Sequence, residues 1–268
     1  NPLPVPNSFV LSELYFDAEG KWTIELSFIG YSFLETNDIF IRTVSGYSLL
    51  KNLNYDAILK SHILKITKDS LLTDLAINPS GDSVYISRGV VTQLIPTLIF
   101  GNLPNANIRA PKSGESISLY GYDCTYYDEY SYSLSHILDY DYSIDKSPSM
   151  GEKNDSTGMF GTIKGKIYDP HNLLPPDVWL AGVGITDFKP DIDGNFFARI
   201  TSSNHTIDKL YYSTNKGALA YGYYVETIPV NVSTEPDSTV NVELTITGIV
   251  ASVENVNTGS ESVLKISP

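Results

Sequence analysis

Residues 161–169 read GTIKGKIYD and residues 191–196 read DIDGNF, and these two stretches decide the fold. The first is typical of a strand that opens with glycines. The second is typical of a polar turn that ends in Asp-Gly just before an aromatic strand, a common connection between two hairpin strands. We therefore expect a small β-sandwich in this part of the chain.

Strand patterns also occupy the rest of the chain. Residues 22–28 read WTIELSF, an alternation that places Trp22, Ile24, Leu26 and Phe28 on one buried face. Residues 240–246 alternate in the same way, whereas residues 55–68 carry the clearest helical period. The 19 Tyr favour strands, and the 15 Pro and 19 Gly supply turns. The chain is predicted to be all-β, with two β-sandwiches in tandem.

Charge and metal-binding residues exclude several classes of function. The formal net charge is −13, so the chain lacks the basic stripe of a nucleic-acid binder and is repelled by anionic membrane surfaces. Cys124 is the single cysteine and the four His are scattered, which argues against a disulfide and a thiolate metal site. The longest apolar stretch, residues 90–100, is too short to span a bilayer. We expect no metal, no cofactor, no nucleic acid and no transmembrane segment.

A change in composition divides the chain. Residues 147–158 are polar and rich in Ser, Gly, Asn and Asp, so we expect them to form an exposed connection. This places a first sandwich over residues 1–150 and a second over residues 159–246. Residues 247–268 are expected to be a polar linker.

Four short stretches of the first part occur in a familiar order. They are LSEL at residues 11–14, WTIEL at residues 22–26, NPSGDSVYI at residues 78–86 and GESISLY at residues 114–120. Together they resemble a lamin-tail domain. The resemblance implies an immunoglobulin-like sandwich.

The second part carries another ordered set of features. These are Gly161, Gly165, the turn at Pro175-Pro176, residues 178–183, Asp193-Gly194 with Phe196, and residues 240–244. They resemble the carboxypeptidase regulatory-like domain, which implies a transthyretin-like sandwich with no catalytic residues of its own.

Residues 248–268 end in VLKISP. They resemble the run-up to a type IX secretion sorting tail of Bacteroidetes. This resemblance implies export across the outer membrane, to the medium or the outer-membrane surface of a bacterium.

Residues 120–142 form the sharpest candidate for a binding site. Eight tyrosines lie among carboxylates here, and no Lys or Arg falls between Lys112 and Lys146. Phenol rings stack on the apolar faces of sugars, and carboxylates accept hydrogen bonds from hydroxyls. The candidate ligand-binding residues are Tyr126, Tyr127, Asp128, Glu129, Tyr130 and Tyr132. The expected partner is a protein or a neutral glycan at the cell surface; the alternative is an ordinary pair of strands with Tyr on a half-exposed face.

Two other groups of acidic residues have simpler explanations. Asp187, Asp191, Asp193 and Asn195 could hold calcium, but the spacing fails the calcium-loop pattern and Asp193-Gly194 reads as a hairpin turn. Glu13 and Glu25 fall on neighbouring predicted strands and could pair as acid and base. Glu25, however, is expected on the solvated face opposite Trp22, so we predict no catalytic residues.

These observations favour a non-catalytic, exported or cell-surface interaction or adhesion module. Two alternatives stay open. The chain could supply accessory carbohydrate-binding domains to a secreted degradative system, or it could be a purely structural surface component.

Overall fold

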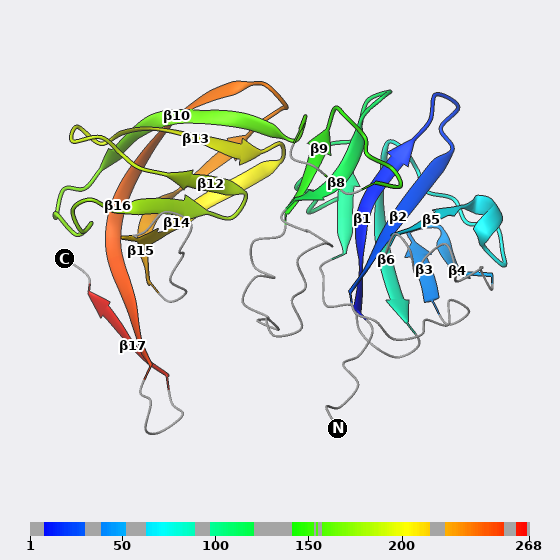
Figure 1. Ribbon diagram of the computed structural model, residues 1–268, viewed down its shortest axis with the longest axis horizontal. Coiled ribbons are helices and arrows are strands. Elements are labelled where there is room, and N and C mark those ends of the chain that lie inside the picture. The colour runs from blue at the N-terminus through cyan, green and yellow to red at the C-terminus, as the bar shows by residue number, and fades with distance from the viewer. Residues whose placement is uncertain are drawn as a thin grey trace. The chain divides into compact units, whose positions relative to one another are not determined.

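The computed structural model describes residues 8–29, 39–51, 63–88, 97–120, 141–152, 154, 157–214, 223–254 and 261–266 (Figure 1). Regular structure in these residues is strand, apart from one 3-10 turn at Lys68–Ser70. This confirms the all-β prediction. The helix expected over residues 55–68 does not form in its described part, because Ile63–Thr67 is a strand. No helix in the described part of the chain is long and apolar enough to cross a membrane.

The first of two compact units, Asn1–Met159, contains two antiparallel sheets. The five-stranded sheet has the order β5-β2-β1-β8-β9 and comprises β1 (Ser8–Phe16), β2 (Trp22–Ile29), β5 (Ile63–Thr67), β8 (Ser116–Tyr120) and β9 (Asp141–Asp145). The four-stranded sheet has the order β4-β3-β6-β7 and comprises β3 (Ile39–Thr43), β4 (Gly46–Leu49), β6 (Gly81–Arg88) and β7 (Leu98–Gly101). One apolar cluster takes side chains from both sheets, as expected for a sandwich.

The predicted buried face of β2 is confirmed for the three side chains that the structure describes. Trp22, Ile24 and Leu26 have exposed fractions of 6, 0 and 0% and belong to the apolar cluster. The side chain of Phe28 lies outside the described residues. The Trp22 indole N–H donates to the Leu75 carbonyl at 3.2 Å, so the polar atom of this buried ring is satisfied.

The second unit, Phe160–Pro268, is built on a single sheet of eight strands. In spatial order they are β10 (Phe160–Tyr168), β13 (Asn195–Thr201), β12 (Ile185–Phe188), β11 (Trp179–Gly182), β14 (Asn204–Ser213), β15 (Tyr223–Ser233), β16 (Thr239–Glu254) and β17 (Glu261–Ile266). β10 also pairs in parallel with the first half of β16. The sheet therefore closes into a barrel of seven strands, where two separate sheets were expected.

Glycines permit this closure and the turn beside it. A Cβ on Gly165 of β10 would overlap the Val242 carbonyl of β16 and crowd the Phe196 ring of β13. Only glycine fits there without moving the backbone. Gly194 has a φ of 81°, a left-handed conformation that the predicted Asp193-Gly194 hairpin turn requires.

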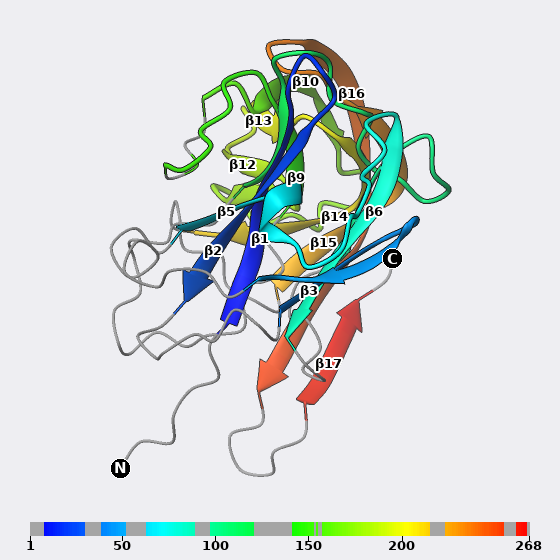
Figure 2. The ribbon, with the colours of Figure 1, turned by 90° about the vertical axis from the view of Figure 1, so that its right-hand side faces the viewer.

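The end of the chain differs from the polar linker that we expected. β16 continues through Glu254, and β17 pairs with it in an antiparallel register from Ile249–Ile266 to Glu254–Glu261. Figure 2 shows β17 beside the second half of β16. The first half of β16 pairs with β10, so one edge of this long strand serves two partners in succession.

Candidate functional site

The candidate tyrosine-rich site lies outside the described residues. Tyr126, Tyr127, Asp128, Glu129, Tyr130 and Tyr132 all fall within residues 121–140. Tyr142, at the end of the same stretch, is described and is only 6% exposed. Its hydroxyl donates to the Leu11 carbonyl at 3.0 Å, and burial raises its pKa. This ring is part of the core, while the six candidate residues remain a prediction.

The acidic turn of the second unit is closed by its own hydrogen bonds. Asp191 Oδ1 accepts from the backbone N–H of Asp193 at 3.0 Å and of Asn195 at 2.8 Å. The Asn195 side chain also donates to Asp191, which holds the pKa of that carboxyl below its usual range. No group of three or more His, Cys, Asp or Glu among the described residues could hold a metal ion. The geometry here is that of a hairpin turn.

Glu13 and Glu25 are brought together, but not on a solvated face. They are cross-strand partners on β1 and β2. Their exposed fractions are 0 and 1%, so the expectation that Glu25 is solvated is wrong. The face opposite Trp22 is polar and yet covered, because Ser149 and Gly151 lie over it and bond to the two carboxylates.

The polar face is organised as a row across five strands. Lys65, Glu25, Glu13, Ser118 and Ser143 are successive cross-strand partners from β5 to β9. A β-bulge between Leu11 and Glu13 adds one residue, Ser12, to β1. The bulge shifts the alternation, so that Leu11 and Leu14 both enter the apolar cluster while Glu13 joins the polar row.

Each carboxylate of the pair accepts hydrogen bonds from the protein. Glu13 Oε1 accepts from Ser116 Oγ at 2.5 Å and from the Ser149 N–H at 3.2 Å. Glu25 accepts from Ser12 Oγ at 2.7 Å through Oε1 and from the Gly151 N–H at 2.5 Å through Oε2. Donors from β1, from β8 and from Ser149 and Gly151 thus converge on the pair.

Burial controls the charge of this pair. It raises the pKa of Glu13 to about 7, an effect opposed by the hydrogen bond from Ser116 and reinforced by the negative charge of Glu25. Burial also raises the pKa of Glu25, although the bonds from Ser12 and Gly151 and the Lys65 ammonium oppose it. Two adjacent buried carboxylates cannot both ionise at low cost. Glu13 therefore keeps its proton to a higher pH than an exposed glutamic acid does.

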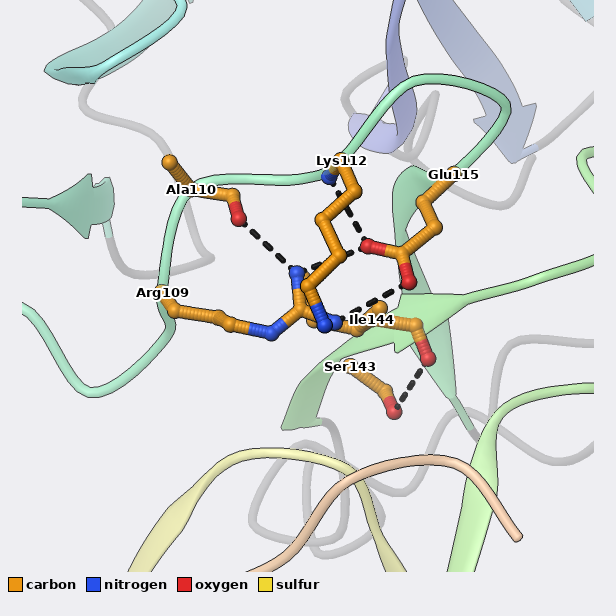
Figure 3. A network of polar contacts seen from close by, with 6 residues as sticks. All are labelled: Arg109, Ala110, Lys112, Glu115, Ser143 and Ile144. Carbon is orange, nitrogen blue, oxygen red and sulfur yellow. Dashed lines mark hydrogen bonds and ion pairs between the residues drawn. The ribbon is translucent and has the colours of Figure 1, made fainter.

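A second polar network fixes the loop that leads into β8 (Figure 3). Arg109 donates to Glu115 through its two terminal guanidinium nitrogens, Nη1 at 2.7 Å and Nη2 at 3.0 Å, and Nη1 also donates to the Ala110 carbonyl at 2.8 Å. The Lys112 N–H adds a bond to Glu115 at 2.8 Å. Burial alone would raise the pKa of Glu115, but the bonds from Arg109 and Lys112 outweigh it and hold that pKa below its usual range. The bidentate geometry makes this network a structural clamp.

The outer face of β11, β14 and β15 carries aromatic side chains that the sequence analysis did not single out. We call Trp179, Tyr211 and Tyr224 the aromatic strip; all three are partly exposed. Their neighbours Leu180, Leu210 and Val225 point the other way, into the barrel core. Tyr211 and Tyr224 are cross-strand partners whose rings meet edge to face at 6.0 Å.

Two cations flank the strip. Lys209 Nζ lies 5.6 Å from the ring centre of Tyr224, and Lys189 Nζ lies 6.0 Å from that of Trp179. Lys189 also forms an ion pair with Asp177 at 2.5 Å. The sequence does hold a signal for the strip: Tyr-Tyr occurs at residues 211–212 and again at residues 223–224, at facing ends of two predicted strands.

No family model, curated protein or solved structure matches this chain.

Proposed function

We propose that this chain is a non-catalytic interaction module that binds its partner through the aromatic strip. The observation that carries the proposal is the placement of Trp179, Tyr211 and Tyr224 on the outer face of the barrel rather than in its core. Tyr and Trp provide large contact areas at low cost in conformational entropy, which is why they are enriched in binding surfaces.

The burial and hydrogen bonding of Glu13 and Glu25 support the non-catalytic part of the proposal. An acid–base pair must reach the atoms of a substrate. Glu13 and Glu25 are buried, and both accept hydrogen bonds from the chain's own serines and backbone. Their arrangement suits a structural role.

The leading partner is a protein, and a neutral glycan is the alternative. Aromatic rings serve both kinds of ligand, because they pack against apolar side chains and against the faces of sugars. Asp177 pairs with Lys189 and Glu226 lies across from Lys209, so the two lysines at the edges of the strip are balanced and the proposed protein partner would be held mainly by contact with the rings. Residues 126–132 are proposed as a second contact.

The cellular setting is also a proposal. We infer that the chain is exported and acts outside the cell or on a bacterial outer-membrane surface. This rests on the resemblance of residues 248–268 to a sorting-tail region, and on the single cysteine. The immunoglobulin-like and transthyretin-like assignments of the two units rest likewise on the resemblances of residues 8–150 and 159–246.

Panels of immobilised extracellular proteins and neutral glycans would test the proposed function. The triple variant Trp179→Ala, Tyr211→Ser, Tyr224→Ser should lose binding at least tenfold. Phe197→Ser is the matched control, because Phe197 is an aromatic residue that is 66% exposed on another strand, β13. Binding that survives the triple variant would rule out the strip, and no binding to either panel would favour a purely structural component.

A further inference from the structure

The outer face of the four-stranded sheet in the first unit is mostly apolar, whereas the outward residues of a sandwich strand are usually polar. Ile39 and Ile41 of β3 belong to the core cluster, so the residues that alternate with them point outward. The same alternation runs through β4, β6 and β7, and the remaining outward positions on β6 are serines. We call the following residues the outer face: Phe40, Arg42, Tyr47, Leu49, Tyr85 and Ile99.

Large apolar side chains on and beside the outer face are open to solvent. Tyr47 is 63% exposed, and its ring lies 6.3 Å from that of Phe40 on the neighbouring strand. Leu72 is 59% exposed and lies beside β4, because its N–H donates to the Leu49 carbonyl at 2.9 Å. Val44, in the turn that joins β3 to β4, is 67% exposed. Exposed apolar patches of this kind are typical of surfaces that contact another protein.

Arg42 lies at the centre of the outer face. It is the cross-strand partner of Tyr47 on one side and of Tyr85 on the other. Its side chain is exposed, and within the described ranges its guanidinium has neither an ion pair nor a hydrogen bond. The outer face itself carries no carboxylate, although the whole chain has a net charge of −13. This surface therefore combines apolar side chains with one cation whose charge is not balanced on the same face.

We propose that the outer face binds a protein segment that presents an aspartate or glutamate among apolar side chains, with Arg42 as the residue that selects the carboxylate. A guanidinium can donate two parallel hydrogen bonds to a carboxylate, a geometry that lysine cannot match. The tyrosine rings on either side would shield this ion pair from water once the segment is bound, and the shielding would strengthen it. The outer face belongs to the first unit, so the proposal does not rest on the aromatic strip.

The charge of the chain narrows the chemistry of the partner. A net charge of −13 repels an acidic molecule at a distance, so a densely acidic protein or a polyphosphate is disfavoured. A segment with one carboxylate between apolar residues avoids most of this repulsion and still pairs with Arg42 at short range. A neutral glycan would stack on the tyrosines but leave the charge of Arg42 without a partner. The outer face therefore favours a protein segment over a sugar.

Binding of the full chain to immobilised, end-blocked heptapeptides tests the proposal. Three peptide sets carry Glu, Gln or Lys at the centre, with Leu or Phe at the flanking positions and serines at the ends. The Glu set should bind about tenfold more tightly than the Gln set, the difference that a charge-assisted pair of hydrogen bonds makes. Equal binding of these two sets, or no binding to either, would overturn the proposal. Dimerisation of the free chain that Arg42→Gln abolishes would assign the outer face to a second copy and would overturn it too.

Substitutions of Arg42 supply the specific test. Arg42→Gln should reduce binding of the Glu set to the level of the Gln set. Arg42→Glu should reverse the preference toward the Lys set, a result that a merely structural role of Arg42 would not give. Arg199→Gln is the matched control, because Arg199 is an exposed strand arginine of the second unit that lies 4.1 Å from the ring centre of Phe160. A preference for Glu that survives Arg42→Gln, or that disappears in Arg199→Gln, would contradict the proposal.

The outer face and the aromatic strip can be tested separately. The triple variant Trp179→Ala, Tyr211→Ser, Tyr224→Ser changes only the second unit, so it should keep the preference for the Glu set. Loss of that preference in the triple variant would mean that the peptides bind at the aromatic strip, and the proposal for the outer face would fail.

Discussion

Raising the pH should destabilise the first unit through Glu13. A carboxyl whose pKa is higher in the folded state binds its proton more tightly there, so its contribution to stability is present at low pH and is lost as the pH rises. For Glu13 the relevant window runs from 4.5, its ordinary value, to about 7. Each unit of pKa difference is worth about 1.4 kcal/mol, so the loss across this window is about 3 kcal/mol.

Urea denaturation at pH 5 and pH 8 measures this effect. Trp22 and Trp179 are the only two tryptophans, one in each unit, so the substitution Trp179→Phe leaves a fluorescence signal from the first unit alone. In this background, the free energy of unfolding should fall by about 2.5 kcal/mol from pH 5 to pH 8, slightly less than the full difference because the window opens at 4.5. Adding Glu13→Gln should flatten the dependence, whereas Glu152→Gln should not. A first unit that is as stable at pH 8 as at pH 5 would refute the reasoning.

Three other substitutions test separate parts of the structure. Trp22→Ala should cost about 3–5 kcal/mol in urea denaturation, because it removes a buried ring; an unchanged midpoint would contradict its burial. Gly165→Ala should lower the melting temperature of the second unit, followed by Trp179 fluorescence, since the added methyl overlaps the β16 backbone; an unchanged melt would mean that β10 and β16 are not so close. Arg109→Met should cost about 1–3 kcal/mol at pH 7 by stranding buried Glu115. A carboxyl whose pKa is lowered in the folded state adds stability only while it is ionised, so the cost of Arg109→Met should shrink as the pH falls below 4.5 and Glu115 takes up a proton. A cost that does not change with pH would argue against the clamp.

Local patterns were sufficient for the strands and for one turn. The alternation of Trp22, Ile24 and Leu26 depends only on the two-residue period of a strand, and it marked the buried face of β2. Asp193-Gly194 marked its turn because a left-handed residue is required there. Such features are set by neighbours in the sequence, so the sequence reveals them.

The buried carboxylates could not be predicted in that way. A period of two places Glu25 opposite Trp22, but it cannot say that Ser149 and Gly151, far along the chain, will cover this face. The bulge at Ser12 further hid Glu13, since it breaks the alternation that identifies a face. The barrel closure is equally non-local, because β10 meets β16 some 80 residues later.

The two-partner edge of β16 has a consequence for self-association. A barrel has no free strand edges, and unpaired edges are the sites where chains add to one another. β16 extends past the stretch that β10 covers, and β17 occupies the remaining edge over residues 249–254. A chain shortened at Glu254 would keep its closed barrel but expose the backbone N–H and C=O groups of that edge. β17 therefore covers this edge of β16, and since β17 is the last strand in the order of the described sheet, the edge to which another strand could add moves from β16 to β17.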